Sequence, residues 1–205
     1  MELASSEIDE KPNRFVQLRL DRFKKDLAQL EGHDAVRKHI ILGDCYVLNA
    51  DLHYTLRASV SNEFSIRPEN VLMVGSGKLG FSIAPDKRYR PFSDTSDIDL
   101  ALVSDKLFDE IWMDVLRFDV EVGSWDEKRM FRNYLMNGWI RPDSLPRSQL
   151  FPRRDHWWNF FRSLSECGSY GSYKIAAGIY RTPEFLERYQ LNSVMACKAA
   201  VELGS

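Results

Sequence analysis

The stretch VLMVGSGKLGFSIAPDKRYRPFSDTSDIDLALV, residues Val71 to Val103, decides the fold of this chain. Its four-residue apolar start predicts a buried strand over residues 71–74, and glycines at 75, 77 and 80 end that strand in a turn. A second strand is predicted over residues 98–103, after a polar insert that contains two prolines. We expect the end of the first strand and the start of the second to meet at one pocket.

Two carboxylates, Asp97 and Asp99, lie two residues apart where the second strand begins. Side chains alternate along a strand, so both are expected on the same face of the sheet. Two like charges in that position repel each other, and a divalent cation with oxygen ligands is the usual remedy. The pair therefore predicts a metal site.

A glycine–serine turn after one strand, followed by an Asp-x-Asp motif at the start of the next, resembles the nucleotidyltransferase superfamily, whose best-known relative is DNA polymerase β. The resemblance covers roughly the middle third of the chain. It implies a mixed α+β fold, with a small mixed sheet flanked by helices and further helices at both ends of the chain. The residues that carry it are Gly75, Ser76, Lys78, Ser96, Asp97 and Asp99.

The resemblance also implies a reaction. The turn residues Gly75 and Ser76, with Lys78 and Ser96, would bind a nucleoside triphosphate, while the paired aspartates would hold Mg²⁺ or Mn²⁺. A nucleoside monophosphate would then pass to a protein, RNA or small-molecule acceptor. Small proteins of this kind are often found in toxin–antitoxin or phage-defence modules, which suggests a partner protein. The alternative is a catalytically inactive relative that binds a nucleotide or a partner protein.

Enzymes of this superfamily usually add a third carboxylate from a strand beside the Asp-x-Asp pair. The strand predicted over residues 173–180 has no acid on either face. Three explanations are open. Asp119 or Glu121 supplies the ligand if FDVEVG, residues 118–123, forms a strand; two carboxylates and water suffice, as Mg²⁺ tolerates; or the chain binds a nucleotide without turnover.

The segment GSGKLG, residues 75–80, also has the G-x-G-x-x-G pattern of a dinucleotide-binding fold, which would make the protein an oxidoreductase. That fold needs a helix that opens at the glycines, and the insert with Pro85 and Pro91 argues against one. The Walker A pattern is excluded, because Leu79 stands where Ser or Thr must follow Gly-Lys.

The amino-acid composition limits the class of protein and the number of domains. The chain has 205 residues, 44% hydrophobic content, a net charge of −2 and three widely separated cysteines, which fits one domain with reduced thiols. No apolar run approaches the ~20 residues of a membrane span, and the N-terminus is unlike a secretion signal. We therefore expect a cytoplasmic protein with no membrane association.

The rest of the chain predicts mainly helices. Residues 1–12 lack periodicity and are expected to be disordered, whereas residues 13–205 form a single domain, with a helical lead-in over 13–64 and a sheet core with helices over 65–205. A loop is expected over residues 138–146. Helices are predicted over residues 13–30, 34–42, 49–64, 104–116, 126–137, 155–164 and 182–202.

Overall fold

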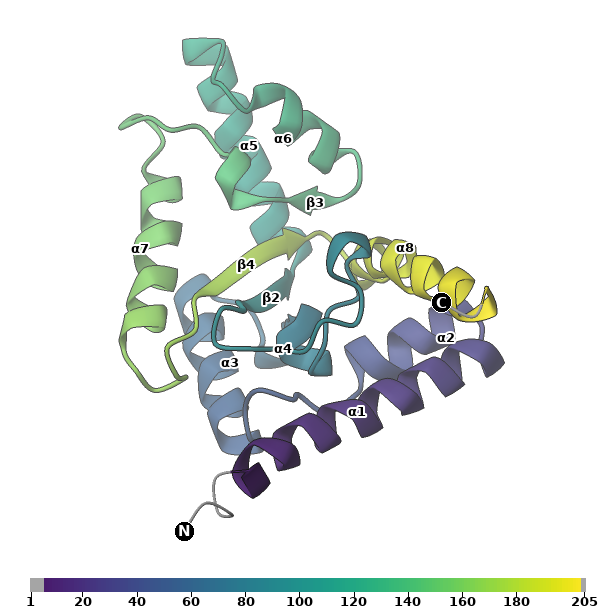
Figure 1. Ribbon diagram of the computed structural model, residues 1–205. Coiled ribbons are helices and arrows are strands. Elements are labelled where there is room, and N and C mark those ends of the chain that lie inside the picture. Colours follow the sequence, from purple (N-terminus) through teal and green to yellow (C-terminus); the bar gives the residue numbers. More distant parts are fainter. Residues whose placement is uncertain (1–5, 204–205) are drawn as a thin grey trace.

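The computed structural model describes residues 6–203, which form a mixed α+β structure with a four-stranded sheet (Figure 1). The strands are β1 (Val71–Val74), β2 (Ile98–Val103), β3 (Trp139–Ile140) and β4 (Ile175–Tyr180). The helices are α1 (Ser6–Gln29), α2 (Gly32–Val36), α3 (Ala50–Phe64), α4 (Gly75–Leu79), α5 (Asp105–Val122), α6 (Lys128–Leu135), α7 (Pro152–Glu166) and α8 (Pro183–Glu202), with a π-helical turn over Arg37–Ile41. None of the helices within residues 6–203 has both the length and the apolar character needed to cross a bilayer.

The sheet has the order β1-β2-β4-β3, and only its central pair of strands is parallel. Strand β1 runs antiparallel to β2, with Val74 opposite Asp99, so the end of β1 lies beside the start of β2. A dinucleotide-binding fold joins parallel strands through a helix. The antiparallel pairing of β1 and β2 therefore argues against the oxidoreductase alternative.

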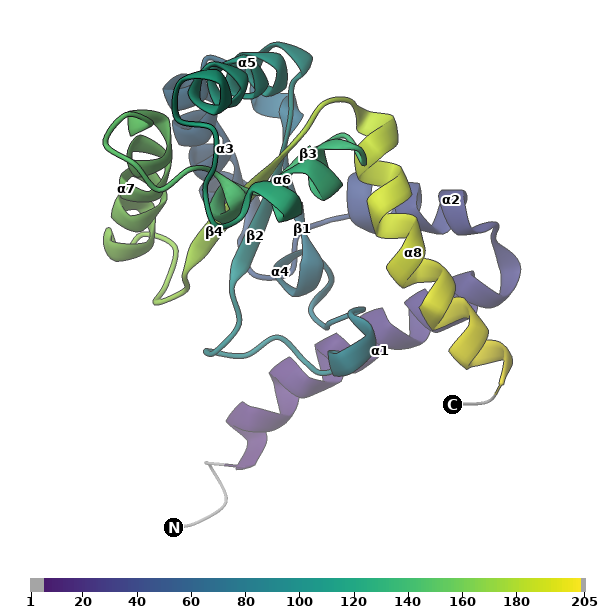
Figure 2. The same ribbon diagram turned by 90° about the horizontal axis from the view of Figure 1, so that it is seen from above.

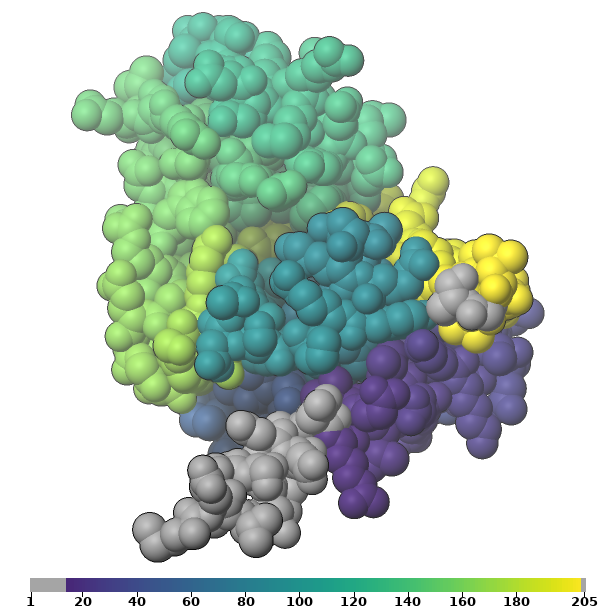
Figure 3. All heavy atoms as spheres, in the orientation of Figure 1, coloured from purple at the N-terminus to yellow at the C-terminus, as the bar shows by residue number. Residues whose placement is uncertain are grey.

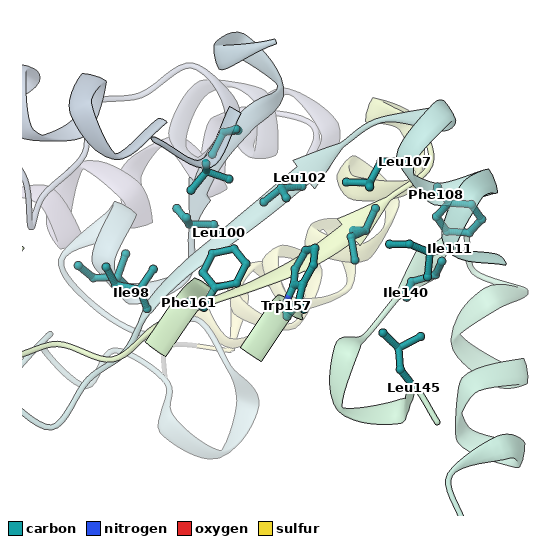
Figure 4. Packing of buried hydrophobic residues seen from close by; sticks show 14 of the residues in the cluster. Ile98, Leu100, Leu102, Leu107, Phe108, Ile111, Ile140, Leu145, Trp157 and Phe161 are labelled. Atoms are coloured by element: carbon teal, nitrogen blue, oxygen red, sulfur yellow. The ribbon is translucent and has the colours of Figure 1, made fainter. Parts of the chain in front are cut away.

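The two faces of the sheet bury two hydrophobic cores. Figure 2 shows the helices that lie on either side of the sheet. Helices α3, α5 and α7 cover one face, where Ile98, Leu100 and Leu102 of β2 point toward Trp157 and Phe161 of α7 (Figure 4). Helices α1, α2 and α8 cover the other. Because side chains alternate along β2, Asp97 and Asp99 share this second face with Ala101 and Val103.

Helix starts follow the capping signals in the sequence. The side chain of Asn49 accepts a hydrogen bond from the backbone N–H of Leu52 at 2.9 Å, and Ser104 caps α5 in the same way through Leu107 at 3.1 Å. Helix α1 departs from the expectation, because it begins at Ser6 rather than near residue 13. The apolar periodicity that predicted this helix starts only at Val16, so the sequence pattern did not show the earlier turns. Residues 1–5 of the segment expected to be disordered lie outside the described residues.

Two other segments differ from what the sequence suggested. The strand left open for residues 118–123 does not form, because residues 118–122 belong to the last turns of α5, where their apolar positions continue the helical stripe that buries Val115 and Phe118. The predicted loop over residues 138–146 contains the short strand β3, which pairs with Tyr180 and Ile179 of β4. A two-residue strand has too few positions to show an alternating pattern in the sequence.

The Asn49 cap allows a direct test of the predicted start of α3. We expect the Asn49→Ala variant to lose about 1 kcal/mol in its free energy of unfolding, because the N–H of Leu52 loses its partner at the start of α3. Urea denaturation followed by circular dichroism measures the change. Asn49→Asp keeps an acceptor at this position and should unfold like the natural protein, and equal losses in both variants would contradict the assigned cap.

Candidate functional site

A cavity of about 690 Å³ opens where β1 ends and β2 begins, on the sheet face that α8 covers. The antiparallel register brings Val74 of β1 opposite Asp99 of β2, so the residues just after Val74 reach the paired aspartates. Five of the six residues singled out in the sequence line this one cavity: Gly75, Ser76, Ser96, Asp97 and Asp99.

Gly75 packs directly against the carboxylate of Asp99. Its backbone has φ +66°, and a Cβ atom at this position would lie 3.0 Å from Asp99 Oδ2. Glycine is favoured here for two reasons, since L-residues seldom adopt positive φ and a side chain would press on the acid. The glycine thus leaves room for the Asp99 carboxylate in the wall of the cavity.

The charge of the Asp99 carboxylate is only partly compensated by nearby cations. Burial, and then the charge of Asp97, raises the pKa of Asp99 to about 6, although its side chain is still open to the solvent in the cavity. Lys174 and Lys87 act in the opposite direction, and Lys174 Nζ lies 4.0 Å from Asp97 Oδ2. Among the described residues, none donates a hydrogen bond to the carboxylate of Asp99.

The glycine turn itself differs from the expectation. Residues Gly75–Leu79 form the one-turn helix α4, against which the two prolines had argued. Gly80, with φ +91°, ends this helix, so that Pro85 and Pro91 lie beyond it and do not oppose it.

Lys78 does not reach the aspartates. Its side chain points away from them and is only 4% exposed, and its ammonium group donates a hydrogen bond to the carbonyl oxygen of Gly43. It lines a different cavity, on the other side of α4 from Ser76. Three successive positions on a helical turn point in different directions, and the sequence alone could not fix which one faces the acids.

Neither candidate for a third carboxylate lies in the cavity. Asp119 and Glu121 are on α5, and Asp119 bonds to Lys128 instead. Asp143 lines the cavity, pairs with Arg141 at 2.9 Å through Oδ2, and leaves Oδ1 buried without a hydrogen-bond partner among the described residues. The only sequence signal for Asp143 is an acid between prolines in an expected loop. Among residues 14–203, whose side chains the structure describes, no three Asp, Glu, His or Cys side chains are grouped closely enough to hold a metal ion.

The remaining walls of the cavity are basic and aromatic. The insert between α4 and β2 forms one wall and spreads over the front of the molecule beside α8 (Figure 3). Trp139 of β3 stacks on Tyr180 of β4, with ring centroids 5.8 Å apart and planes 5° from parallel. The cationic residues at the cavity are Lys87, Arg90, Arg141 and Lys174, and the aromatic ones are Trp139, Trp158, Tyr180 and Tyr189.

Two contacts hold the insert in place. Phe81 and Ile83 are buried in the core between α1 and α8, and Phe81 pairs with Pro91 in an isolated antiparallel bridge. The Tyr89 hydroxyl donates to the carbonyl oxygen of Cys197 on α8 at 3.5 Å. The insert therefore presents Lys87 and Arg90 to the cavity from an anchored loop.

Comparison of the chain with protein-family models, with curated proteins and with solved structures gives no match.

Proposed function

We propose that this protein is a metal-dependent nucleotidyltransferase, which transfers a nucleoside monophosphate from a nucleoside triphosphate to an acceptor. One observation carries the proposal. Asp97 and Asp99 share a cavity with the Gly75–Ser76 turn of the neighbouring strand, and four cationic side chains stand around the same cavity. This reaction needs carboxylates that bind a metal ion and cationic side chains that bind the phosphates.

The donor set fits a hard divalent cation. Mg²⁺ and Mn²⁺ prefer carboxylate oxygens, and Mg²⁺ commonly keeps several waters, so one pair of acids is enough to hold it. Asp97 and Asp99 are the residues that would hold it. No described residue donates a hydrogen bond to Asp99, and burial, followed by the charge of Asp97, raises the pKa of this acid. When bound, the metal would supply Lewis-acid polarisation of the reacting phosphate and activation of the attacking hydroxyl.

The other residues of the cavity would bind and orient the substrate. The hydroxyl of Ser76 and nearby backbone N–H groups can donate to phosphate oxygens, and Lys87, Arg90 and Lys174 can offset their charge. Ser96 stabilises the loop just before β2, because its Oγ accepts a hydrogen bond from the backbone N–H of Ser93 at 3.0 Å. The anchored insert stands at the entrance, where it would select the acceptor.

The number of carboxylates at the proposed metal site supports a second candidate function. Among the described residues no group of three carboxylates stands ready for a metal, which also suits a module that binds nucleotide without turnover and acts on a partner protein. Release of pyrophosphate separates the two candidates. A partner in a toxin–antitoxin or defence complex fits either of them.

Incubation with each α-labelled nucleoside triphosphate and Mg²⁺ or Mn²⁺ tests the proposal. We expect pyrophosphate release, with label on protein, RNA or a soluble product, and loss of both when EDTA is added. Nucleotide binding by calorimetry without pyrophosphate release would favour the inactive module instead. Absence of both binding and release would overturn the proposal.

The insert gives a separate prediction about substrate affinity. Arg90→Gln should raise the KM for the nucleoside triphosphate about tenfold, because a charged phosphate contact in an open cavity contributes about 1–2 kcal/mol. Steady-state pyrophosphate release measures it. Arg129→Gln removes an exposed arginine on α6 outside the cavity and should leave KM unchanged; an equal change in both variants would assign the effect to net charge.

A further inference from the structure

A second cavity, of about 610 Å³, lies on the other side of β1 and α4 and shares no lining residue with the first. Its walls come from the segment after the π-helical turn, from the first half of α3 and from β1. Arg19 of α1 holds one side in place, because its guanidinium donates to the carbonyl oxygens of Asp44, Lys78 and Leu79 at 2.8–2.9 Å. The cavity is thus built into the fold.

The unusual group in this cavity is Lys78. A buried lysine is normally paired with a carboxylate, because removing an ammonium ion from water is costly. Lys78 instead donates to one backbone carbonyl oxygen, that of Gly43, and lies 3.9 Å from Cys45 Sγ. Among the described residues, no carboxylate forms an ion pair with it. Within the described part of the chain, its charge is therefore met only by a carbonyl oxygen and a thiol sulfur, which are both uncharged acceptors.

A second cation reinforces this charge. Arg57 on α3 lines the same cavity and uses its Nε to donate to the carbonyl oxygen of Pro68 at 2.7 Å. Burial, and then the charges of Arg57 and Lys78, lowers the pKa of His53 to about 4, so that this histidine is neutral at pH 7. Its ring lies 3.4 Å from Cys45 Sγ through Nε2.

The acids at this cavity limit the excess charge but do not remove it. Glu69 already pairs with Arg67 at 2.6 Å, and Asp44 is exposed at the rim. Two cations that line the cavity, against one exposed acid at its rim, favour a monoanion over a phosphate dianion. Apolar side chains that suit a hydrocarbon body also line the cavity: Ile41, Leu42, Leu48, Val71 and Met73.

We propose that this cavity binds a small organic carboxylate, with its head group beside Lys78 and Arg57 and its apolar part against Leu48 and Met73. The size of the cavity falls within the range of small-molecule sites, about 300–1,000 Å³. This site is separate from the proposed nucleotide cavity, and its occupation does not depend on whether the protein transfers nucleotides.

Octanoate is a suitable probe, and 1-octanol is its neutral match. By titration calorimetry we expect octanoate to bind the natural protein at least tenfold more tightly than 1-octanol. Lys78→Met should remove this preference, because it keeps the length of the side chain and loses the charge. Lys174→Met, which removes a cation from the other cavity, should keep the preference. Equal affinities of the natural protein for the two probes would overturn the proposal.

A second measurement needs no variant and locates the bound probe. Cys45 lines the cavity and Cys167 is exposed elsewhere, so N-ethylmaleimide labelling of both can be followed by peptide mass spectrometry. Octanoate should slow the labelling of Cys45 several-fold and leave that of Cys167 unchanged. Octanoate binding that leaves the labelling of Cys45 unaffected would place the probe outside this cavity and overturn the proposal.

Discussion

Replacement of Asp99 by asparagine is expected to lower the rate of nucleotide transfer about a thousandfold, which corresponds to about 4 kcal/mol of lost transition-state stabilisation. The amide keeps the shape of the side chain and its place beside Gly75, but it removes the negative charge that would hold a divalent cation with Asp97. Pyrophosphate release at saturating nucleoside triphosphate and Mg²⁺ measures the effect. A rate within tenfold of the natural protein would remove Asp99 from the proposed metal site.

The stability of the same variant serves as a control, because we expect stability to stay equal or rise while activity falls. The pKa of Asp99 is about 6 in the folded protein, above its ordinary value of 3.8, so the folded state favours the protonated acid. That contribution to stability is fully present below about pH 4 and is lost as the pH rises through about 6. Without divalent cations, Asp99→Asn should therefore unfold at the same or a higher temperature than the natural protein at pH 7.5. A markedly lower melting temperature would show that the activity loss reflects damage to the fold.

The Gly75→Ala variant should lose about 2–3 kcal/mol in its free energy of unfolding, and its transfer rate should fall about tenfold. Alanine at φ +66° costs about 1–2 kcal/mol by itself. Its Cβ would also lie 3.0 Å from Asp99 Oδ2, so the carboxylate must move away from its position in the cavity. Urea denaturation and pyrophosphate release measure the two effects.

Gly123 offers a matched control for the backbone cost. It has φ +88° at the end of α5, and a Cβ there would meet nothing within 4 Å. Gly123→Ala should therefore lose only about 1–2 kcal/mol and keep its transfer rate. If both variants lost the same stability and the same activity, the contact between Gly75 and Asp99 would have no role of its own.

The residues that sequence analysis placed correctly are those whose position follows from local periodicity. The apolar run of β1 and the alternation in β2 determine that Asp97 and Asp99 share a face, and the cap at Asn49 depends on residues within one turn of helix. Such features need no knowledge of the rest of the chain. For this reason the mixed α+β fold could be predicted from the sequence.

The features that were missed depend on contacts between distant segments. Lys78 points to Gly43, thirty-five positions away, and Asp143 reaches the cavity only because β3 pairs with β4. Acids near the end of α5 looked available for a third ligand, whereas Asp119 bonds to Lys128 nine positions later. No local sequence pattern distinguishes an acid that faces a cavity from one that forms an ion pair with a nearby lysine.

The short helix α4 contributes residues to both of the cavities described above. Ser76 lines one cavity and Lys78 lines the other, and both residues belong to the same helical turn. A substitution that changes the backbone of this turn would therefore alter the lining of both cavities at once.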